Sequence, residues 1–147
     1  MSTPTNLRLD DQLCFALYAA TNQVTRAYRP LLERIGLTYP QYLVMLVLWE
    51  GDGRAINDIA GRLQLSAHAL SPMLRRLEQA DLLQRHVDGS DGRVVIVSLT
   101  PRGRALESAA SSAQHEVVHQ TGLCGEDLAD LREALHSLVL TMSTEQP

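Results

Sequence analysis

Apolar residues recur at helical spacing over the first quarter of the chain. From about Asp10 to Ile35 they fall three and four positions apart, which predicts an amphipathic helix that Gly36 ends. At ~1.5 Å per residue this helix would be about 40 Å long. Such a helix is long for a monomer of 147 residues, so we expect it to pack against another chain.

A second helix is predicted to begin at Thr38. Thr38 and Gln41 have the spacing of a capping box, and Pro40 is tolerated in a first turn. The apolar run that follows reaches Trp49, and the glycines of 51–53 supply a stop. The capping signal favours a helix of about eleven residues over a buried strand.

The middle of the chain has the pattern of a DNA-binding motif. A short apolar-periodic helix is followed by a tight break at 64–66 and by a second helix over 66–80, with Ser66 as a candidate cap. Two β-rich runs, Leu82–Val87 and Val94–Leu99, then flank a polar, glycine-containing loop. A helix-turn-helix followed by a β-hairpin is the plan of a winged helix.

Two further helices are predicted in the last third. The first begins at Thr100 and Pro101 and runs to about Thr121, and the second follows a break at 122–125. We therefore predict a mainly α fold with a small β-hairpin wing, in one domain covering 1–147. Residues 54–100 form its winged helix-turn-helix. We expect the helices of 10–36 and 101–143 to form an intertwined dimerisation region. This region would place the winged helix-turn-helix motifs of the two subunits about one turn of DNA apart.

Composition narrows the class of protein. Apolar residues are 45% and charged residues 20% of the chain, which is typical of an ordered globular domain. The longest apolar run, Tyr42–Trp49, is too short to span a bilayer, and the polar N-terminus does not have the plan of a signal peptide. We therefore expect a cytoplasmic protein with no membrane partner.

The charge is unevenly distributed. The net charge is −4, but residues 54–104 contain eight Arg and five acidic residues, whereas the rest contains five Arg and twelve acidic residues. A basic middle between acidic ends indicates a surface that faces an anion such as DNA. All thirteen basic residues are Arg, which favours bidentate contacts to phosphate and guanine but also fits a bias in codon use.

Five residues of the second motif helix are candidates for DNA contact. Ser66, His68 and Ser71 lie early in the helix, where side chains reach base edges in the major groove. Arg75 and Arg76 lie further along and suit phosphates or guanine. In the wing, Arg93 is predicted to enter the minor groove, with Asp91 extending it through a charge-assisted bond. The alternative is that these arginines are ordinary surface residues.

Two cysteines, Cys14 and Cys124, are too few for a disulfide scaffold. Cys14 is predicted about one turn into the first helix, whose N-terminus stabilises a thiolate, although Asp10 and Asp11 oppose this effect. Tyr18 follows at i+4 on the same face. Cys14 is therefore either a reactive thiol or a small hydrophobic residue in the core. Cys124, in the break before the last helix, is a candidate second thiol or a bystander.

Several motifs resemble the MarR family of bacterial regulators. They are Arg75-Arg76-Leu77-Glu78 with Leu82-Leu83, and Asp91-Gly92-Arg93 with Leu99-Thr100 and Gly103. Within that family, the segments 13–19 (LCFALYA) and 37–43 (LTYPQYL) resemble the organic hydroperoxide resistance regulators. The resemblance covers roughly residues 9–142. The family often has Thr where Ala69 or Ser71 stands here, and His68 is unusual at its position.

The resemblance implies a redox-controlled repressor that works as a homodimer on double-stranded operator DNA. Organic hydroperoxide is its signal, and it has no cofactor and is not an enzyme. Tyr28 and Tyr39 of the partner subunit would hydrogen-bond the Cys14 sulfur, with Tyr18 nearby. A sulfenic acid on Cys14 would then condense with Cys124 of the other subunit and release the DNA. A low-molecular-weight thiol that caps Cys14 is the alternative to Cys124.

Three other hypotheses about the function stay open. A small aromatic ligand in a pocket lined by Tyr18, Tyr28, Tyr39 and Tyr42 could gate DNA binding instead of oxidation. A metal sensor would use His115 and His119, four residues apart, with His136 and Cys124, although no metal site is expected from so weak a pattern. A thiol peroxidase would use Cys14, but no peroxidase motif, catalytic triad, phosphate loop or carboxylate pair is present.

Overall fold

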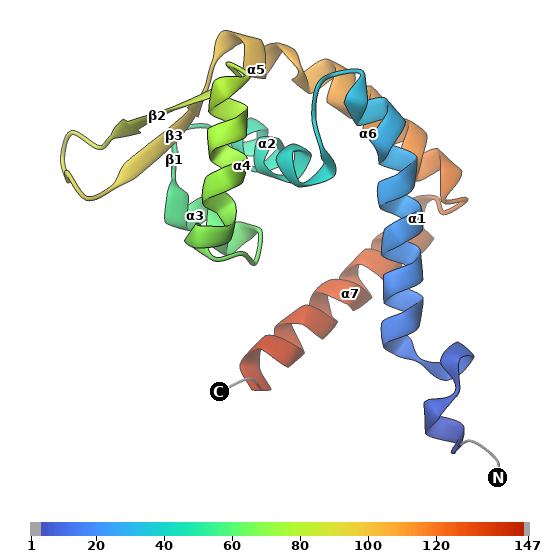
Figure 1. Cartoon of the computed structure of the whole chain (residues 1–147). Helices are drawn as coiled ribbons and strands as arrows, with labels where there is room; N and C mark the ends of the chain where they lie inside the picture. The colour runs from blue at the N-terminus through green and yellow to red at the C-terminus, as the bar shows by residue number, and fades with distance from the viewer. Residues whose placement is uncertain (1–3, 146–147) are drawn as a thin grey trace.

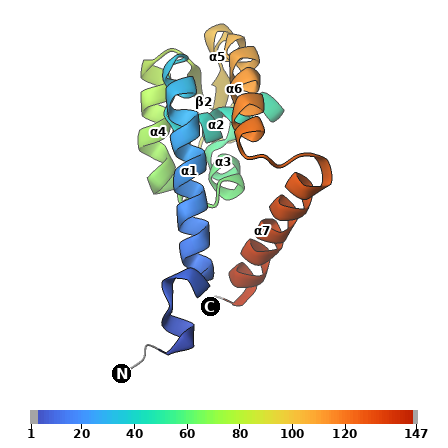
Figure 2. The same cartoon turned by 90° about the vertical axis from the view of Figure 1, so that its right-hand side faces the viewer.

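The computed structural model describes residues 4–145, which form a mainly helical chain with one small antiparallel sheet (Figures 1 and 2). Two 3-10 turns (Thr5–Leu7 and Leu9–Asp11) precede α1 (Leu13–Glu33), α2 (Tyr39–Glu50), β1 (Arg54–Ala55), α3 (Ile56–Arg62), α4 (Ala67–Gln79), β2 (Leu83–Val87), β3 (Val95–Leu99), α5 (Pro101–Ala105), α6 (Glu107–Gln120) and α7 (Gly125–Glu145). The winged-helix class predicted from the sequence is confirmed.

The start of α1 differs from the prediction. Asp10 and Asp11 belong to a separate 3-10 turn, and the helix begins only after Gln12, whose backbone is extended. The Gln12 side-chain amide donates to the carbonyls of Asn6 and Arg8, both at 2.8 Å, and so stabilises this break. Cys14 therefore lies in the first turn of α1, among backbone N–H groups that have no helical partner.

The predicted capping box of α2 is confirmed. The Thr38 hydroxyl accepts from the Gln41 backbone N–H at 3.3 Å, and the Gln41 side chain accepts from the Thr38 N–H at 3.0 Å. Upstream, Gly36 has φ +75° and ends the chain's first helical segment as predicted. α2 runs through the centre of the core, where Val44, Met45 and Leu48 are fully buried, and this explains why it is apolar around most of its circumference.

The helix-turn-helix consists of α3 and α4. Gln64 takes a left-handed conformation (φ +58°) in the connecting turn, and the Ser66 side chain caps α4 by accepting from the Ala69 N–H at 3.0 Å. The apolar stripe of α4, formed by Leu70, Leu74 and Leu77, is buried against the core. Its opposite face is left to solvent, as a helix that enters a DNA groove requires.

The wing is a hairpin of β2 and β3, as predicted, but the sheet has a third strand that the sequence analysis missed. The order is β1-β3-β2, with Arg54 opposite Val97 and Ala55 opposite Ile96. A strand of two residues is too short for alternation to reveal it. It anchors the base of the wing, which extends away from the helices in Figure 1.

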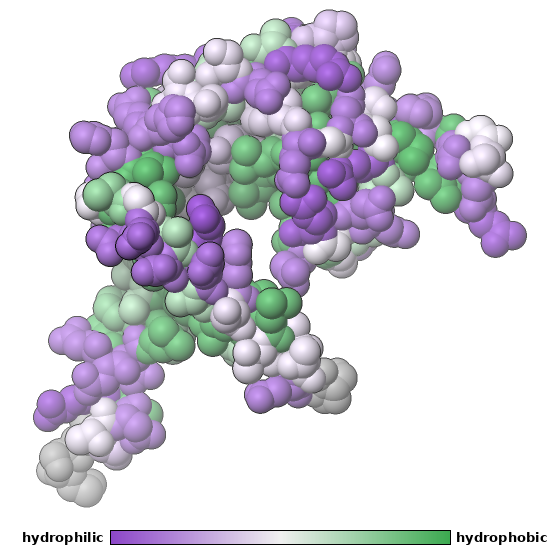
Figure 3. Space-filling model, turned by 180° about the vertical axis from the view of Figure 1, so that it is seen from behind, coloured by the Kyte–Doolittle hydropathy of each residue, from purple (hydrophilic) through white to green (hydrophobic). Residues whose placement is uncertain are grey.

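The predicted helix from Thr100 to Thr121 is interrupted at Leu106, so that α5 leads into α6 through one non-helical residue. α6 packs against α1, and Ala110, Ala113 and Val117 are buried there. α7 buries none of its residues. In Figures 1 and 2 the first half of α1 and α7 extend from the body of the molecule as two arms, and hydrophobic residues gather on them in Figure 3.

Candidate redox site and nucleic-acid interface

Cys14 is an exposed, free thiol at the second residue of α1. Its neighbours are also uncovered, since Leu13 is 61% exposed and Tyr18, one turn further on, is 66% exposed. In the single chain, Cys14 therefore does not pack in the core as a small hydrophobic residue would. The exposed apolar face beside it has the character of a surface that a second chain covers.

Three tyrosines form a cluster between α1 and α2. The ring centroids of Tyr28 and Tyr39 are 5.4 Å apart, and those of Tyr28 and Tyr42 are 5.2 Å apart. Burial, followed by the neighbouring Tyr42 hydroxyl, raises the pKa of Tyr28 well above its usual range, and burial also raises the pKa of Tyr39. Both phenols are therefore protonated at neutral pH and can donate hydrogen bonds.

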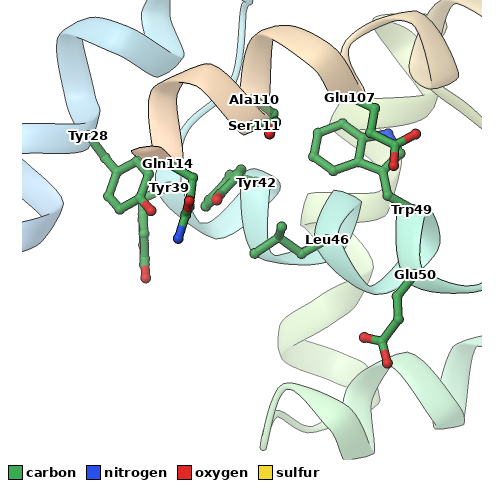
Figure 4. A pocket seen from close by; sticks show the side chains of 10 residues that line it. All are labelled: Tyr28, Tyr39, Tyr42, Leu46, Trp49, Glu50, Glu107, Ala110, Ser111 and Gln114. Carbon is green, nitrogen blue, oxygen red and sulfur yellow. The ribbon is translucent and has the colours of Figure 1, made fainter. Parts of the chain in front are cut away.

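The cluster lines one side of a groove of about 640 Å³ that also includes Leu46, Trp49 and residues of α6 (Figure 4). Tyr42 also belongs to the cluster, although the sequence analysis named it only as a residue of a possible ligand pocket. No sequence motif around Tyr42 distinguishes a member of this cluster from an ordinary core residue. The aromatic rings continue to Trp49, whose centroid is 6.5 Å from that of Tyr42.

The two groups of predicted redox residues are far apart within one chain. Cys14 and Tyr28 are fourteen residues apart in α1, which corresponds to about 21 Å along the helix. Tyr18 therefore lies one helical turn after Cys14 in α1, whereas Tyr28 lies beside Tyr39 of α2. A contact between the thiol and the tyrosine cluster requires a second chain.

Cys124 is exposed in the link between α6 and α7, directly before the first residue of α7. Its thiol is also free, and its backbone carbonyl accepts from the Asp127 N–H at 3.2 Å. The side chain is therefore accessible to a second thiol.

The candidate DNA-contacting side chains of α4 are mostly exposed. His68, Arg75 and Arg76 are open to solvent, whereas Ser71 is half-buried. The Ser66 oxygen caps the helix by accepting from the Ala69 N–H, and its hydroxyl proton remains available to a base or phosphate. The capping role of Ser66 was predicted from the sequence, whereas the partial burial of Ser71 was not.

The tip of the wing differs from the prediction in one bond. Asp91 accepts from the backbone N–H of Arg93 at 3.0 Å, whereas the sequence analysis expected its carboxylate to bind the guanidinium. The reason is local: an Asp side chain reaches the N–H two residues ahead and closes a tight turn. Among residues 4–145, the Arg93 guanidinium forms no ion pair and is exposed.

Three of the eight arginines in residues 54–104 form ion pairs with carboxylates. Arg62 pairs with Glu50 at 2.8 Å, Arg85 pairs with Glu78 at 3.3 Å, and Arg104 pairs with Asp52. In the part of the chain that the structure describes, Arg75, Arg76 and Arg93 form no such pair. The three arginines that the sequence assigned to DNA are therefore available for phosphates or bases.

The structure does not assemble the metal site considered above. Across residues 4–145, no three His, Cys, Asp or Glu side chains are grouped so that they could bind a metal ion, and His115, His119 and His136 are no exception. Within the same residues, none of the helices is long and apolar enough to cross a membrane.

Comparison with known proteins gives close relatives. The sequence profile of the SarA/Rot transcriptional regulators matches residues 26–109. The organic hydroperoxide resistance transcriptional regulator of Bacillus subtilis (strain 168) is 38% identical over 137 residues, which are 93% of this chain and 93% of that protein. The HTH-type transcriptional regulator TtmR of Methylorubrum extorquens (strain PA1) is 43% identical over 146 residues, 95% of this chain and 74% of that protein.

Solved structures of AbfR from Staphylococcus epidermidis share the fold. Reduced AbfR bound to DNA has a TM-score of 0.77 at 34% identity, covering 93% of this chain and 95% of that chain. Overoxidised AbfR bound to DNA has a TM-score of 0.79 at 34% identity, with 97% and 100% covered. The disulfide form has a TM-score of 0.65 at 34% identity, with 95% and 92% covered. These relatives are transcriptional regulators, not enzymes.

Proposed function

Because the chain belongs to the MarR-type family of winged-helix transcriptional regulators, we propose that it is a redox-sensing repressor that binds operator DNA as a homodimer. In this proposal residues 54–100 read the DNA and the helices of 10–36 and 101–143 join the two subunits. Organic hydroperoxide oxidises Cys14 and thereby releases the operator. The protein works in the cytoplasm, where both thiols are reduced at rest.

The exposed surface supports a dimer. The chain exposes 10350 Å², whereas a compact monomer of 16.2 kDa exposes about 7,500 Å² by the usual scaling. The excess is concentrated on the two arms, where Leu13, Tyr18, Leu140 and Met142 are each more than half exposed. Burying these side chains against the same arms of a second copy gives a two-fold interface.

The arrangement of α4 and the wing supports DNA binding. The exposed face of α4 presents His68, Arg75 and Arg76 to the major groove, and Arg93 extends from the wing towards the minor groove. Ser66, Ser71 and Asp91 would take smaller parts, as hydroxyl donors and as the residue that shapes the wing tip. AbfR, which is 34% identical, was crystallised on DNA in its reduced state.

Position and exposure support Cys14 as the redox-active thiol. It lies in the first turn of α1, where unpartnered backbone N–H groups stabilise a thiolate. In the dimer, the protonated phenols of Tyr28 and Tyr39 from the partner subunit donate to the sulfur, and Tyr18 packs beside it. The apolar surroundings of Cys14 favour an organic hydroperoxide over hydrogen peroxide.

The reaction has two steps. The Cys14 thiolate attacks the outer oxygen of ROOH, the O–O bond breaks, and the leaving alkoxide takes a proton from solvent, so that the products are the sulfenic acid of Cys14 and the alcohol ROH. The Cys124 thiol of the other subunit then attacks the sulfenic sulfur, which forms the disulfide and releases water. A dithiol restores both thiols. Since overoxidised AbfR was crystallised on DNA, we attribute release to the disulfide and not to the added oxygen.

The exposed Cys14 thiol at the start of α1 is the observation that carries this proposal, and fluorescence anisotropy on the DNA upstream of the gene tests it. We expect the reduced protein to bind, one equivalent of cumene hydroperoxide to release it, and dithiothreitol to restore binding. Cys14→Ser should stay bound throughout. Wild-type binding that ignores hydroperoxide contradicts the redox mechanism and leaves the DNA-binding role intact.

A ligand-gated repressor is the second candidate, and the groove beside Tyr28, Tyr39 and Tyr42 favours it. Its aromatic walls and volume of about 640 Å³ suit a small aromatic acid. Salicylate added to the Cys14→Ser variant on DNA separates the two candidates. Release of that variant by salicylate supports ligand gating, because oxidation of Cys14 is then impossible.

A further inference from the structure

Asp52, in the link between α2 and β1, binds three segments of the chain at once. Its Oδ1 accepts from the backbone N–H of Leu99 at 2.8 Å and from that of Gly53 at 2.8 Å. Its Oδ2 accepts from the guanidinium of Arg104. One carboxylate thus connects the end of α2, the last residue of the wing strand β3, and α5.

The bond to Leu99 completes the sheet. Arg54 lies opposite Val97 and Ala55 opposite Ile96, so continuing this register places Leu99 opposite Asp52. Gly53, however, has φ +70° and turns the chain out of the strand. The Asp52 carboxylate therefore supplies the acceptor for the Leu99 N–H that a longer β1 would otherwise have provided.

A second contact joins the same two segments. The indole N–H of Trp49, less than one turn before Asp52, donates to the carbonyl of Gly103 at 3.0 Å. α5 is thus attached to α2 through both Gly103 and Arg104. Since α5 leads into α6, which packs on α1, the base of the wing is connected to the dimerisation helices through Asp52 and Trp49.

From this geometry we propose that Asp52 is a positioning residue for the wing. By holding the base of β3, Asp52 fixes Arg93 relative to α5 and α6. This inference rests on the proposed function, in which the wing contacts DNA. The junction also adjoins the tyrosine cluster, because Tyr42 stacks edge-on against Trp49.

A double-mutant cycle on operator affinity tests the role of Asp52. We expect Asp52→Asn to weaken binding of the reduced protein about tenfold and to lower the slope of log Kd against log salt by about two, as Arg93→Ala should by removing one cation per wing from the DNA. Adding Asp52→Asn to Arg93→Ala should change affinity less than twofold. Full additivity of the two changes overturns the proposal.

Glu50→Gln is the matched control, because Glu50, the last residue of α2, also pairs with an arginine, Arg62, but among the described residues forms no hydrogen bond or ion pair with β3 or α5. Hydrogen exchange without DNA gives an independent readout. Residues 95–105 should exchange at least severalfold faster in Asp52→Asn than in Glu50→Gln, and equal rates overturn the proposal. If the wild type does not bind DNA, the proposed function fails, and the exchange data still decide whether Asp52 fixes the wing.

Discussion

The Glu78 carboxylate joins the last turn of α4 to Arg85 in the wing strand β2. It accepts from the Arg85 backbone N–H at 3.2 Å and from the guanidinium Nη2 at 3.3 Å. α4 and the wing are thus connected directly as well as through the core. Any rotation that moves one of them off DNA must move the other with it or break these bonds.

This pair predicts a pH dependence of stability. Hydrogen bonding to Arg85 is the main cause that lowers the pKa of Glu78 below its usual range. A carboxyl with a lowered pKa in the folded state stabilises the fold above its unfolded pKa, and this contribution is lost as pH falls through the folded value. The difference in thermal unfolding temperature between wild type and Glu78→Gln should therefore be largest near pH 7 and shrink below about pH 4.3.

The pair is partly exposed, so we expect the effect of Glu78→Gln at pH 7 to stay within about 1 kcal/mol. Glu116→Gln is the control, because Glu116 lies exposed on α6 and forms no ion pair among the described residues. A difference from wild type that is constant between pH 3 and pH 7 would show that the pairing charge is not the cause.

Two glycines should respond in opposite ways to alanine. A Cβ on Gly103 would lie 2.0 Å from the backbone carbonyl oxygen of Leu82, whereas a Cβ on Gly61 meets no atom within 4 Å. We expect Gly103→Ala to destabilise the fold by at least about 2 kcal/mol, because the backbone must shift. Gly61→Ala should stabilise α3 by about 0.5–1 kcal/mol. Urea unfolding of both variants measures this, and equal effects would contradict the packing around α5.

Local signals made much of this fold predictable. The Thr38–Gln41 capping box and the Ser66 cap depend on residues three positions apart, so their patterns are visible in the sequence. Interruptions were harder to predict. The break at Gln12 depends on side-chain bonds to carbonyls of a separate turn, and no periodicity reveals it.

Long-range contacts explain what the sequence analysis missed in the site. Asp52 contacts residues 47 and 52 positions away, and nothing near it in the chain marks it as more than a turn residue. The grouping of Tyr28 with Tyr42 likewise depends on how α1 crosses α2. The exposure of Arg93 could be anticipated, because it lies in a predicted hairpin turn. The sequence left Cys14 open between a reactive thiol and a core residue, and its exposure became clear only from the structure.

The role of Cys124 predicts a specific behaviour of Cys124→Ser. With no second thiol, oxidation of Cys14 stops at an oxygen-bearing sulfur, so we expect no covalent dimer on a non-reducing gel and retention of DNA by anisotropy. Wild type in the same experiment should form the dimer and release DNA. Release by Cys124→Ser in the absence of other thiols would contradict the intersubunit disulfide.

A further arm of that experiment adds a low-molecular-weight thiol, such as free cysteine, to the oxidised Cys124→Ser protein. Release only after this addition would show that capping of Cys14 can replace the disulfide. Intact mass should then increase by one disulfide-linked cysteine molecule per released subunit, and Cys14→Ser should show neither the mass change nor the release.

The separation of Cys14 and Tyr28 along α1 predicts that they act across the dimer. Tyr28→Phe removes the hydroxyl but keeps the buried ring, so the fold should be preserved while the Cys14 thiolate loses one donor. Since a hydrogen bond to a charged group contributes about 1.5–3 kcal/mol, we expect cumene hydroperoxide to react with Cys14 at least severalfold more slowly in this variant. Stopped-flow consumption of the thiol measures the rate.

Mixed dimers of Tyr28→Phe and Cys14→Ser then decide which subunit supplies the hydroxyl. In such a dimer, the only Cys14 is on the Tyr28→Phe chain, and the only Tyr28 hydroxyl is on the other chain. If the donor comes from the partner, this thiol reacts at the wild-type rate, although the Tyr28→Phe homodimer is slow. A mixed dimer as slow as that homodimer would place the donor in the same chain, which the distance of about 21 Å along α1 does not permit without unfolding part of the helix.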